Sequence, residues 1–188
     1  MHKVIGFHGL PGAGKSTIIN KLELREVNFA TPLKEQVFSL YNAVYKIPRK
    51  CFFGTQADKT LDFGEFDERL KGKGVTGRKA LKAVGTEGYR SHNDSIWIDA
   101  ADTTIKFELH LGHQVGVGDV RFPNEFDLVR KHGGVVIGLQ RFDREYEMDG
   151  HASDILHFDD CDMVINNIDT PLVETLEQVQ VILEALSP

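Results

Sequence analysis

Short apolar runs and longer segments of helical periodicity alternate along most of this chain. The apolar runs predict five strands, at residues 3–9, 27–31, 113–120, 135–140 and 162–166. Between them, apolar residues recur every three or four positions and predict helices near 15–24, 33–44, 78–89, 96–111, 124–132 and 170–186. Strands that alternate with helices form a parallel sheet with right-handed crossovers and helices on both faces. Ligands of such sheets bind at the carboxyl ends of the strands.

The segment from 46 to 77 departs from this alternation. It mixes glycines and charged residues with aromatic residues that we expect to be exposed. A stretch of this length without periodicity is either a disordered loop or a functional excursion, and we favour a mobile excursion. Just before it, the predicted helix at 33–44 places four apolar residues on its buried face, namely Leu33, Val37, Leu40 and Val44.

The strongest motif follows the first predicted strand. Residues 9–16, GLPGAGKS, match the phosphate-binding pattern G-x-x-x-x-G-K-[ST] in full. Its glycines let backbone N–H groups turn toward phosphates, and the following helix presents its positive end. We expect Lys15 to reach the β- and γ-phosphates of ATP, and the Ser16 hydroxyl to bind Mg²⁺. The other residues assigned to this nucleotide site are Gly9, Gly12, Ala13, Gly14 and Thr17.

A carboxylate stands at the end of the third predicted strand. Asp119 is the natural second ligand for the metal ion, directly or through water. The alternative is an ordinary aspartate at a strand end, in a turn with Pro123. Because the chain also contains the phosphate-binding loop, we favour the metal role.

Composition narrows the class of protein. The formal net charge of −6 argues against a general binder of polymeric nucleic acid, which needs a basic surface. Cys51 and Cys161 are the only cysteines and have no metal-ligand spacing, as in a cytoplasmic protein with reduced thiols. We find no signal peptide and no apolar run near the ~20 residues of a membrane span. These features predict a cytoplasmic protein without membrane contact, in the host cytoplasm if its origin is a phage.

The motifs favour a kinase over a GTPase or a mechanical ATPase. Asn166-Asn167-Ile168-Asp169 lacks the lysine of the guanine-binding N-K-x-D, and residues 119–122 lack the glycine of D-x-x-G. A mechanical ATPase needs a transducing domain, for which the length leaves no room. A kinase needs cations around the transferred phosphoryl group and a pocket closed to water. Candidate cations outside the loop are Lys34, Arg78, Arg90, Arg121, Arg141 and Arg144.

Seven segments together resemble the deoxynucleoside monophosphate kinases of bacteriophages. They are GLPGAGKST, ATPLKE, GRKALKAVGTEGYR, IWID, DVRFPNE, RFD…HAS and VINN, which are spread across nearly the whole chain, with the least resemblance at 46–77. The family is often described with aspartate after the glycine and lysine of the loop, where this chain has Ser16. The resemblance implies a P-loop fold, with a five-stranded parallel sheet of order 2-3-1-4-5 between helical layers in a single domain, 1–188. It also implies transfer of the ATP γ-phosphate to a deoxynucleoside monophosphate (dNMP).

The resemblance also implies roles for individual residues. Lys15 and Ser16 would hold ATP and Mg²⁺, with Asp119 supporting the metal and Arg121 bridging the two phosphates. Asn166 would lie near adenine. Residues 141–158 would form a lid, and 46–77 an excursion on the acceptor side. The acceptor-side and lid residues are Lys34, Arg78 and Arg90 for phosphate; Glu87, Tyr89 and Trp97 for the base; and Arg141, Arg144 and His151 in the lid. Trp97 is almost as well explained as a core aromatic residue.

Two alternatives and two properties stay open. The acceptor could be another small phosphorylated molecule, such as dephospho-coenzyme A or phosphomevalonate. The chain could also be a non-catalytic nucleotide-binding module, although the presence of Lys15, Ser16 and Asp119 together speaks against it. The sequence does not indicate which bases are accepted, and a homodimer is compatible with it.

Overall fold

The computed structural model describes residues 3–140, 158–166 and 170–185, without the side chains of Thr86, Glu87 and Arg90. Within these ranges, no helix has the length and apolar composition of a membrane span. The chain divides into two compact units. The first contains residues 1–29 and 100–188, and the second contains residues 30–99. Each unit is described by itself.

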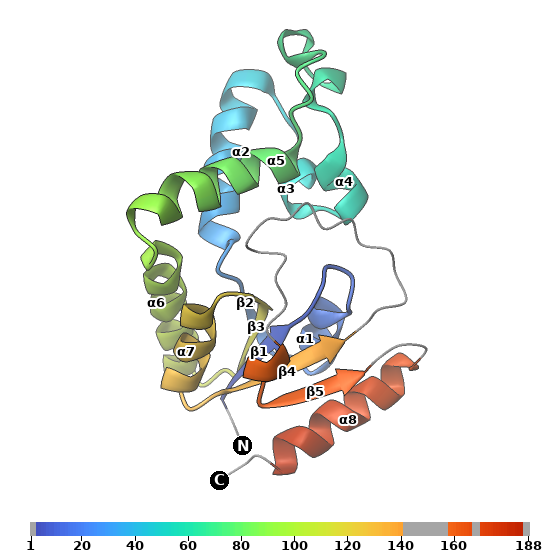
Figure 1. Cartoon of the computed structure of the whole chain (residues 1–188), viewed down its shortest axis with the longest axis vertical. Coiled ribbons are helices and arrows are strands. Elements are labelled where there is room, and N and C mark those ends of the chain that lie inside the picture. Colours follow the sequence, from blue (N-terminus) through green and yellow to red (C-terminus); the bar gives the residue numbers. More distant parts are fainter. Residues whose placement is uncertain (1–2, 141–157, 167–169, 186–188) are drawn as a thin grey trace. The chain divides into compact units, whose positions relative to one another are not determined.

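The first unit contains a five-stranded parallel sheet (Figure 1). Its strands are β1 (Val4–His8), β2 (Arg25–Val27), β3 (Val115–Val120), β4 (Val135–Gln140) and β5 (Met163–Asn166). They lie in the order β2-β3-β1-β4-β5, which confirms the predicted order. The bounds predicted for the second strand, 27–31, are wrong, because β2 ends at Val27. The chain turns there, and the buried Phe29 donates its backbone N–H to the side-chain carboxylate of Asp119 rather than to a backbone carbonyl of β3.

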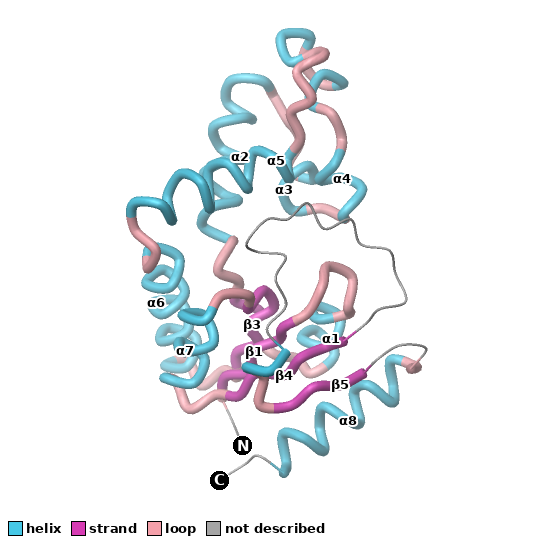
Figure 2. The backbone as a smooth tube through the Cα atoms, viewed as in Figure 1, coloured by secondary structure: helices cyan, strands magenta, loops and turns pink. Residues whose placement is uncertain are grey.

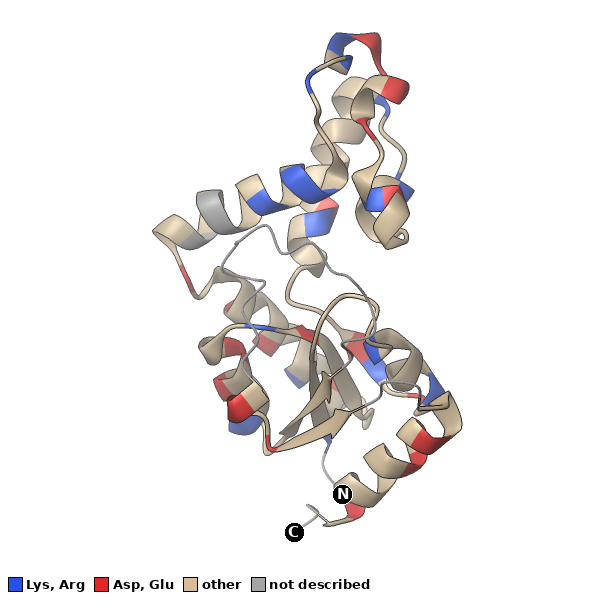
Figure 3. Ribbon diagram, turned by 45° about the vertical axis from the view of Figure 1, so that its right-hand side comes forward, with Lys and Arg blue, Asp and Glu red and all other residues tan. Residues whose placement is uncertain are grey.

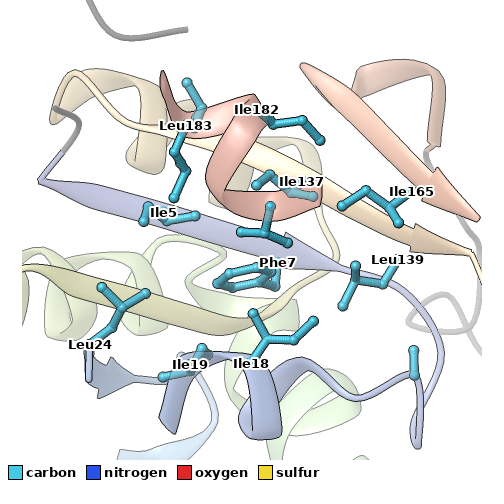
Figure 4. Close-up of a cluster of buried hydrophobic side chains, with 13 residues drawn as sticks. Ile5, Phe7, Ile18, Ile19, Leu24, Ile137, Leu139, Ile165, Ile182 and Leu183 are labelled. Carbon is cyan, nitrogen blue, oxygen red and sulfur yellow. The ribbon is translucent and has the colours of Figure 1, made fainter. Parts of the chain in front are cut away.

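Helices cover both faces of this sheet, as expected for an α/β P-loop fold (Figures 1 and 2). Helices α1 (Lys15–Lys21) and α8 (Leu172–Ala185) lie on one face, and α6 (Ile96–His110) and α7 (Pro123–Lys131) lie on the other. Alternate strand residues face each layer. Phe7 of β1 packs among Ile18, Ile137 and Ile182 in the cluster under α1 and α8 (Figure 4).

Glycine permits the close approach of α7 on the opposite face. A Cβ atom on Gly6 of β1 would lie 3.1 Å from side-chain atoms of Val120, Val129 and Val136. Val129 belongs to α7, so the missing side chain lets this helix lie directly on β1. The three-layer arrangement thus follows from the alternation of large and absent side chains along one strand.

A half-buried carboxylate connects α6 to the end of α7. The Asp102 carboxylate accepts hydrogen bonds from Lys106 Nζ at 2.7 Å, His132 Nε2 at 2.7 Å and Lys131 Nζ at 3.3 Å. These donors, the Lys106 ammonium first among them, lower the pKa of Asp102 to about 2. A carboxyl group with a lowered pKa in the folded state stabilises the fold above its unfolded pKa, and this stabilisation disappears as pH falls through the folded value.

We therefore expect Asp102→Asn to lower the free energy of unfolding by about 1 kcal/mol at pH 7, because the lysine partners are exposed and screened. The difference between the wild type and the variant should shrink below about pH 4 and be lost as pH falls through about 2, where Asp102 becomes protonated. Denaturant unfolding measured at several pH values tests this. A difference independent of pH would show that the carboxylate charge does not matter.

The second unit is helical. Its elements are α2 (Thr31–Tyr45), α3 (Lys50–Phe53), α4 (Gln56–Thr60), the 3₁₀ turns η1 (Phe63–Glu65) and η2 (Glu68–Leu70), α5 (Gly77–Lys82) and a π-helical segment, η3 (Ala83–Arg90). Two predictions are wrong here. The aromatic residues Phe52 and Phe63 are fully buried, with ring centroids 5.6 Å apart. On α2, Leu33 and Val37 are buried but Leu40 and Val44 are 62% and 44% exposed, because in the second half of the helix Tyr41 packs on Phe52 and Phe63 instead.

Candidate functional site

The phosphate-binding loop lies between β1 and α1, at the carboxyl end of the sheet. Gly9, Gly12 and Gly14 have φ angles of 140°, 87° and 94°, which favour glycine over any residue with a side chain. A Cβ atom on Gly9 would lie 2.4 Å from the carbonyl oxygen of Leu139 in β4. The first glycine is therefore required both for its backbone angle and for contact with the neighbouring strand.

Lys15, the first residue of α1, folds back over this loop. Its Nζ donates hydrogen bonds to the carbonyl oxygens of Gly9 at 2.6 Å and Leu10 at 2.8 Å. Burial and the nearby Arg121 guanidinium lower the pKa of Lys15 to about 8, against the opposite effect of Asp119. The ammonium group is thus mainly protonated at neutral pH. It is held beside a second cation and one carboxylate.

The Ser16 hydroxyl contacts a carboxylate that the sequence analysis did not identify. Ser16 Oγ donates to Glu26 Oε1 of β2 at 2.9 Å, and Asn28 Nδ2 donates to the same oxygen at 3.1 Å. The only sequence signal for Glu26 is its position just before the short apolar run at 27–31, and the shifted bounds of that strand concealed it.

Asp119 and Ser16 supply oxygen donors of the kind that Mg²⁺ prefers. Asp119 lies near the end of β3 and accepts the backbone N–H of Phe29 at Oδ1, 2.8 Å away. Across the described residues, no group of three or more His, Cys, Asp or Glu side chains forms a metal cluster. Mg²⁺ usually takes one or two protein carboxylates and completes its shell with waters and substrate phosphates. A hydroxyl and nearby carboxylates therefore fit this ion.

Two buried side chains fix the backbone on either side of Arg121. Glu125, at the start of α7, accepts the backbone N–H groups of Arg121 at 2.7 Å and Phe122 at 3.1 Å. On the preceding side, His8 Nδ1 donates to the carbonyl oxygen of Val120 at 2.8 Å. Glu125 and His8 are 2% and 1% exposed. The Arg121 guanidinium itself makes no hydrogen bond or ion pair to another described residue, which leaves its five N–H donors available.

The predicted acceptor residues that the structure describes lie in the second unit. Lys34, in the first turn of α2, has its Nζ 6.0 Å from the centre of the Phe53 ring. Arg78 of α5 donates to Gln56 Oε1 at 2.6 Å. Three of the six residues of α5 are basic, namely Arg78, Lys79 and Lys82, and Figure 3 shows the basic side of this helix in blue. The Tyr89 and Trp97 rings meet edge to face at 5.4 Å.

The remaining predicted residues divide into two groups. Thr17 is exposed on α1, and Asn166 is exposed at the end of β5 opposite Gln140. Residues 141–157 of the predicted lid lie outside the described residues, and with them Arg141, Arg144 and His151. The side chains of Glu87 and Arg90 are also outside the described part of the chain. In the first unit, the structure thus brings together Lys15, Ser16, Asp119 and Arg121.

Comparison with known proteins finds a relative that matches over nearly the full chain. The "Putative deoxynucleotide monophosphate kinase" of Acanthamoeba polyphaga mimivirus is 30% identical over 192 residues, covering 93% of this chain and 91% of that protein. The solved dephospho-CoA kinase from Campylobacter jejuni covers 98% of both chains at 14% identity with a TM-score of 0.40, too low to support any further argument. No family model matches the chain. By its similarity to the mimivirus protein, the chain belongs to the family of nucleoside monophosphate kinase-like proteins that this relative represents.

Proposed function

We propose that this protein transfers the γ-phosphoryl group of ATP to a dNMP, which yields ADP and a deoxynucleoside diphosphate. The observation that carries the proposal is the pairing of Lys15 with Arg121 beside the glycine loop. Burial, and after it repulsion by the Arg121 guanidinium, lowers the pKa of Lys15 to about 8. Such an arrangement becomes favourable when a polyanion such as a nucleotide phosphate lies between them.

Each residue of the loop would act on charge and position. The backbone N–H groups of 9–16 hold the donor phosphates, and Lys15 neutralises charge on the transferred group. Arg121 presents a planar fork that can contact donor and acceptor phosphates together. Bound Mg²⁺, near Ser16 and Asp119, would supply further charge neutralisation at the phosphates. A phosphate acceptor is already ionised near neutral pH, so the transfer needs no general base.

The choice of a dNMP as acceptor rests on two supports. The mimivirus relative carries the name of a deoxynucleotide monophosphate kinase, and the motifs of this chain resemble the bacteriophage enzymes. We assign the acceptor phosphate to Lys34, Arg78 and Arg90, and lid cations to Arg141 and Arg144. The proposal also includes four further points. They are kinship with the phage enzymes, a cytoplasmic location, one kinase domain over 1–188, and contact of Asn166 with adenine.

A coupled assay of ADP release tests the proposed reaction. The purified chain, ATP and Mg²⁺ are combined separately with each dNMP and each ribonucleoside monophosphate. Dephospho-coenzyme A and phosphomevalonate serve as comparison acceptors, and a reaction without acceptor measures ATP hydrolysis. We expect ADP release to require at least one dNMP and the diphosphate product to appear by chromatography. ADP release only with another acceptor, or with none, would contradict the proposal.

The Tyr89–Trp97 pair offers a test of base recognition. Trp97 is 4% exposed, and its indole N–H has no hydrogen-bond partner in the described part of the chain. A buried donor without a partner costs free energy, which a hydrogen bond to the acceptor base would offset. We expect Trp97→Phe, which keeps an aromatic ring but removes the N–H donor, to raise KM for the dNMP about 10-fold with kcat within about twofold. Steady-state kinetics measures both; an unchanged KM would assign Trp97 to the core alone.

A further inference from the structure

Two glycines of β3 let α1 pack closely on this strand, which lies beside β2. A Cβ atom on Gly116 would lie 2.9 Å from Ile19 Cγ1, and one on Gly118 would lie 3.2 Å from Ile19 Cδ1. Because both side chains are missing, Ile19 packs directly on β3. Ser16 lies one turn before Ile19 on α1, on the same side of the helix. The close packing therefore brings the Ser16 hydroxyl to the neighbouring strand β2, where Glu26 pairs with Gly116.

The hydrogen bonds at Glu26 have a fixed direction. A carboxylate only accepts, so the Ser16 hydroxyl must donate its proton to Glu26 Oε1, 2.9 Å away. Asn28 lies two residues along the chain and donates to the same oxygen at 3.1 Å. Gly118 leaves room for both side chains, since a Cβ atom there would lie 2.9 Å from Asn28 Oδ1 and 3.1 Å from Glu26 Oε1.

We propose that Glu26 is a positioning residue that orients the Ser16 hydroxyl for the divalent cation that accompanies the nucleotide. With its only proton directed at Glu26, Ser16 Oγ can present lone pairs to the cation. Asp119 is less suited to this task, because its Oδ1 accepts the backbone N–H of Phe29. A cation on Oγ also makes the hydroxyl proton more acidic, which strengthens its bond to a carboxylate. The inference rests on the proposed function, since it requires nucleotide and Mg²⁺ at the loop.

Calorimetry of ATP binding, without any acceptor, isolates this role. The measured quantity is the ratio of the ATP Kd in EDTA to the ATP Kd in Mg²⁺. We expect Glu26→Ala to reduce this ratio about 10-fold, as removal of a group that orients a metal ligand does. The Kd in EDTA should stay the same or fall, because a negative charge near the phosphates is lost. Glu26→Gln keeps an acceptor oxygen and should retain the ratio within about threefold.

Two further variants complete the design. Glu184→Ala is the matched control, since Glu184 is exposed on α8 and its side chain makes no hydrogen bond or ion pair with another described residue. In a Ser16→Ala background, Glu26→Ala should have no additional effect, because it acts through the hydroxyl. An unchanged ratio in Glu26→Ala, an equal loss in Glu26→Gln, or an additive loss in the double variant would overturn the inference. Those outcomes leave the proposed function intact, whereas a wild type without Mg²⁺-dependent ATP binding would remove both.

Discussion

Replacing Lys15 by alanine is expected to lower kcat by about 1,000-fold while the fold persists. The side chain lies at the loop, with its ammonium group 2.6 Å from the Gly9 carbonyl oxygen and close to Arg121. Charge that develops on the transferred phosphoryl group would then lack its nearest cation. The fold gains little from this lysine, because burial and Arg121 lower its pKa and so disfavour the charged form.

Single-turnover kinetics and thermal unfolding together test this expectation. The matched control is Lys21→Ala, which removes an exposed lysine from the last turn of the same helix. The control should keep kcat within about twofold, since its charge is screened by solvent. A Lys15→Ala variant that keeps the wild-type kcat would show that the loop is not the site of transfer. A large fall in the unfolding temperature would instead assign the lysine a structural role.

The fold was largely predictable because local and global signals agree in the first unit. Apolar runs of strand length alternate with helical periodicity, and the crossover rule then leaves a parallel sheet. The loop motif adds the position of the site at the carboxyl end of β1. Asp119 and Arg121 follow from the same logic, since they lie at the end of the adjacent strand β3.

The side chains that hold this site in place could not be predicted in the same way. His8 contacts Val120 across 112 residues of sequence, and Asp119 contacts Phe29 across 90. Contacts of this kind depend on the register of neighbouring strands, which periodicity does not determine. A shift of the predicted second strand by a few residues was enough to hide Glu26, because Glu26 then fell outside the strand.

The segment from 46 to 77 shows a different limit. Its helices are too short to produce a periodic apolar pattern, so the glycines and charges dominated the prediction. Their starts were nonetheless marked by side chains that accept backbone N–H groups, namely Thr55, Asp62, Asp67 and Thr76. One glycine has a packing reason: a Cβ atom on Gly77 would lie 1.8 Å from the carbonyl oxygen of Cys51. That close approach depends on tertiary structure and has no local signal.

Arg121→Lys is the substitution that best separates a kinase from a plain ATPase. We expect kcat for phosphoryl transfer to fall by roughly 100-fold, comparable to the loss of one well-placed electrostatic donor. A lysine keeps the charge but presents one ammonium group instead of a planar fork, and so cannot contact two phosphates together. The affinity for ATP should change far less, because the loop and Lys15 carry most of that binding.

The backbone at this position makes the test specific to the side chain. The side chains of Glu125 and His8 bind backbone atoms of Arg121 and Val120, so the substitution leaves both contacts in place. Arg25→Lys on strand β2 is the matched control, since Arg25 is exposed and its side chain has no hydrogen-bond or ion-pair partner in the described part of the chain.

The measurements are kcat and KM for both substrates, with ATP hydrolysis followed in the absence of acceptor. If Arg121→Lys loses ATP affinity but keeps kcat, Arg121 belongs to donor binding, and a lid arginine, Arg141 or Arg144, becomes the better candidate for the bridge. A loss of transfer with unchanged hydrolysis is the result that the bridging role requires, because only the acceptor phosphate then lacks its contact.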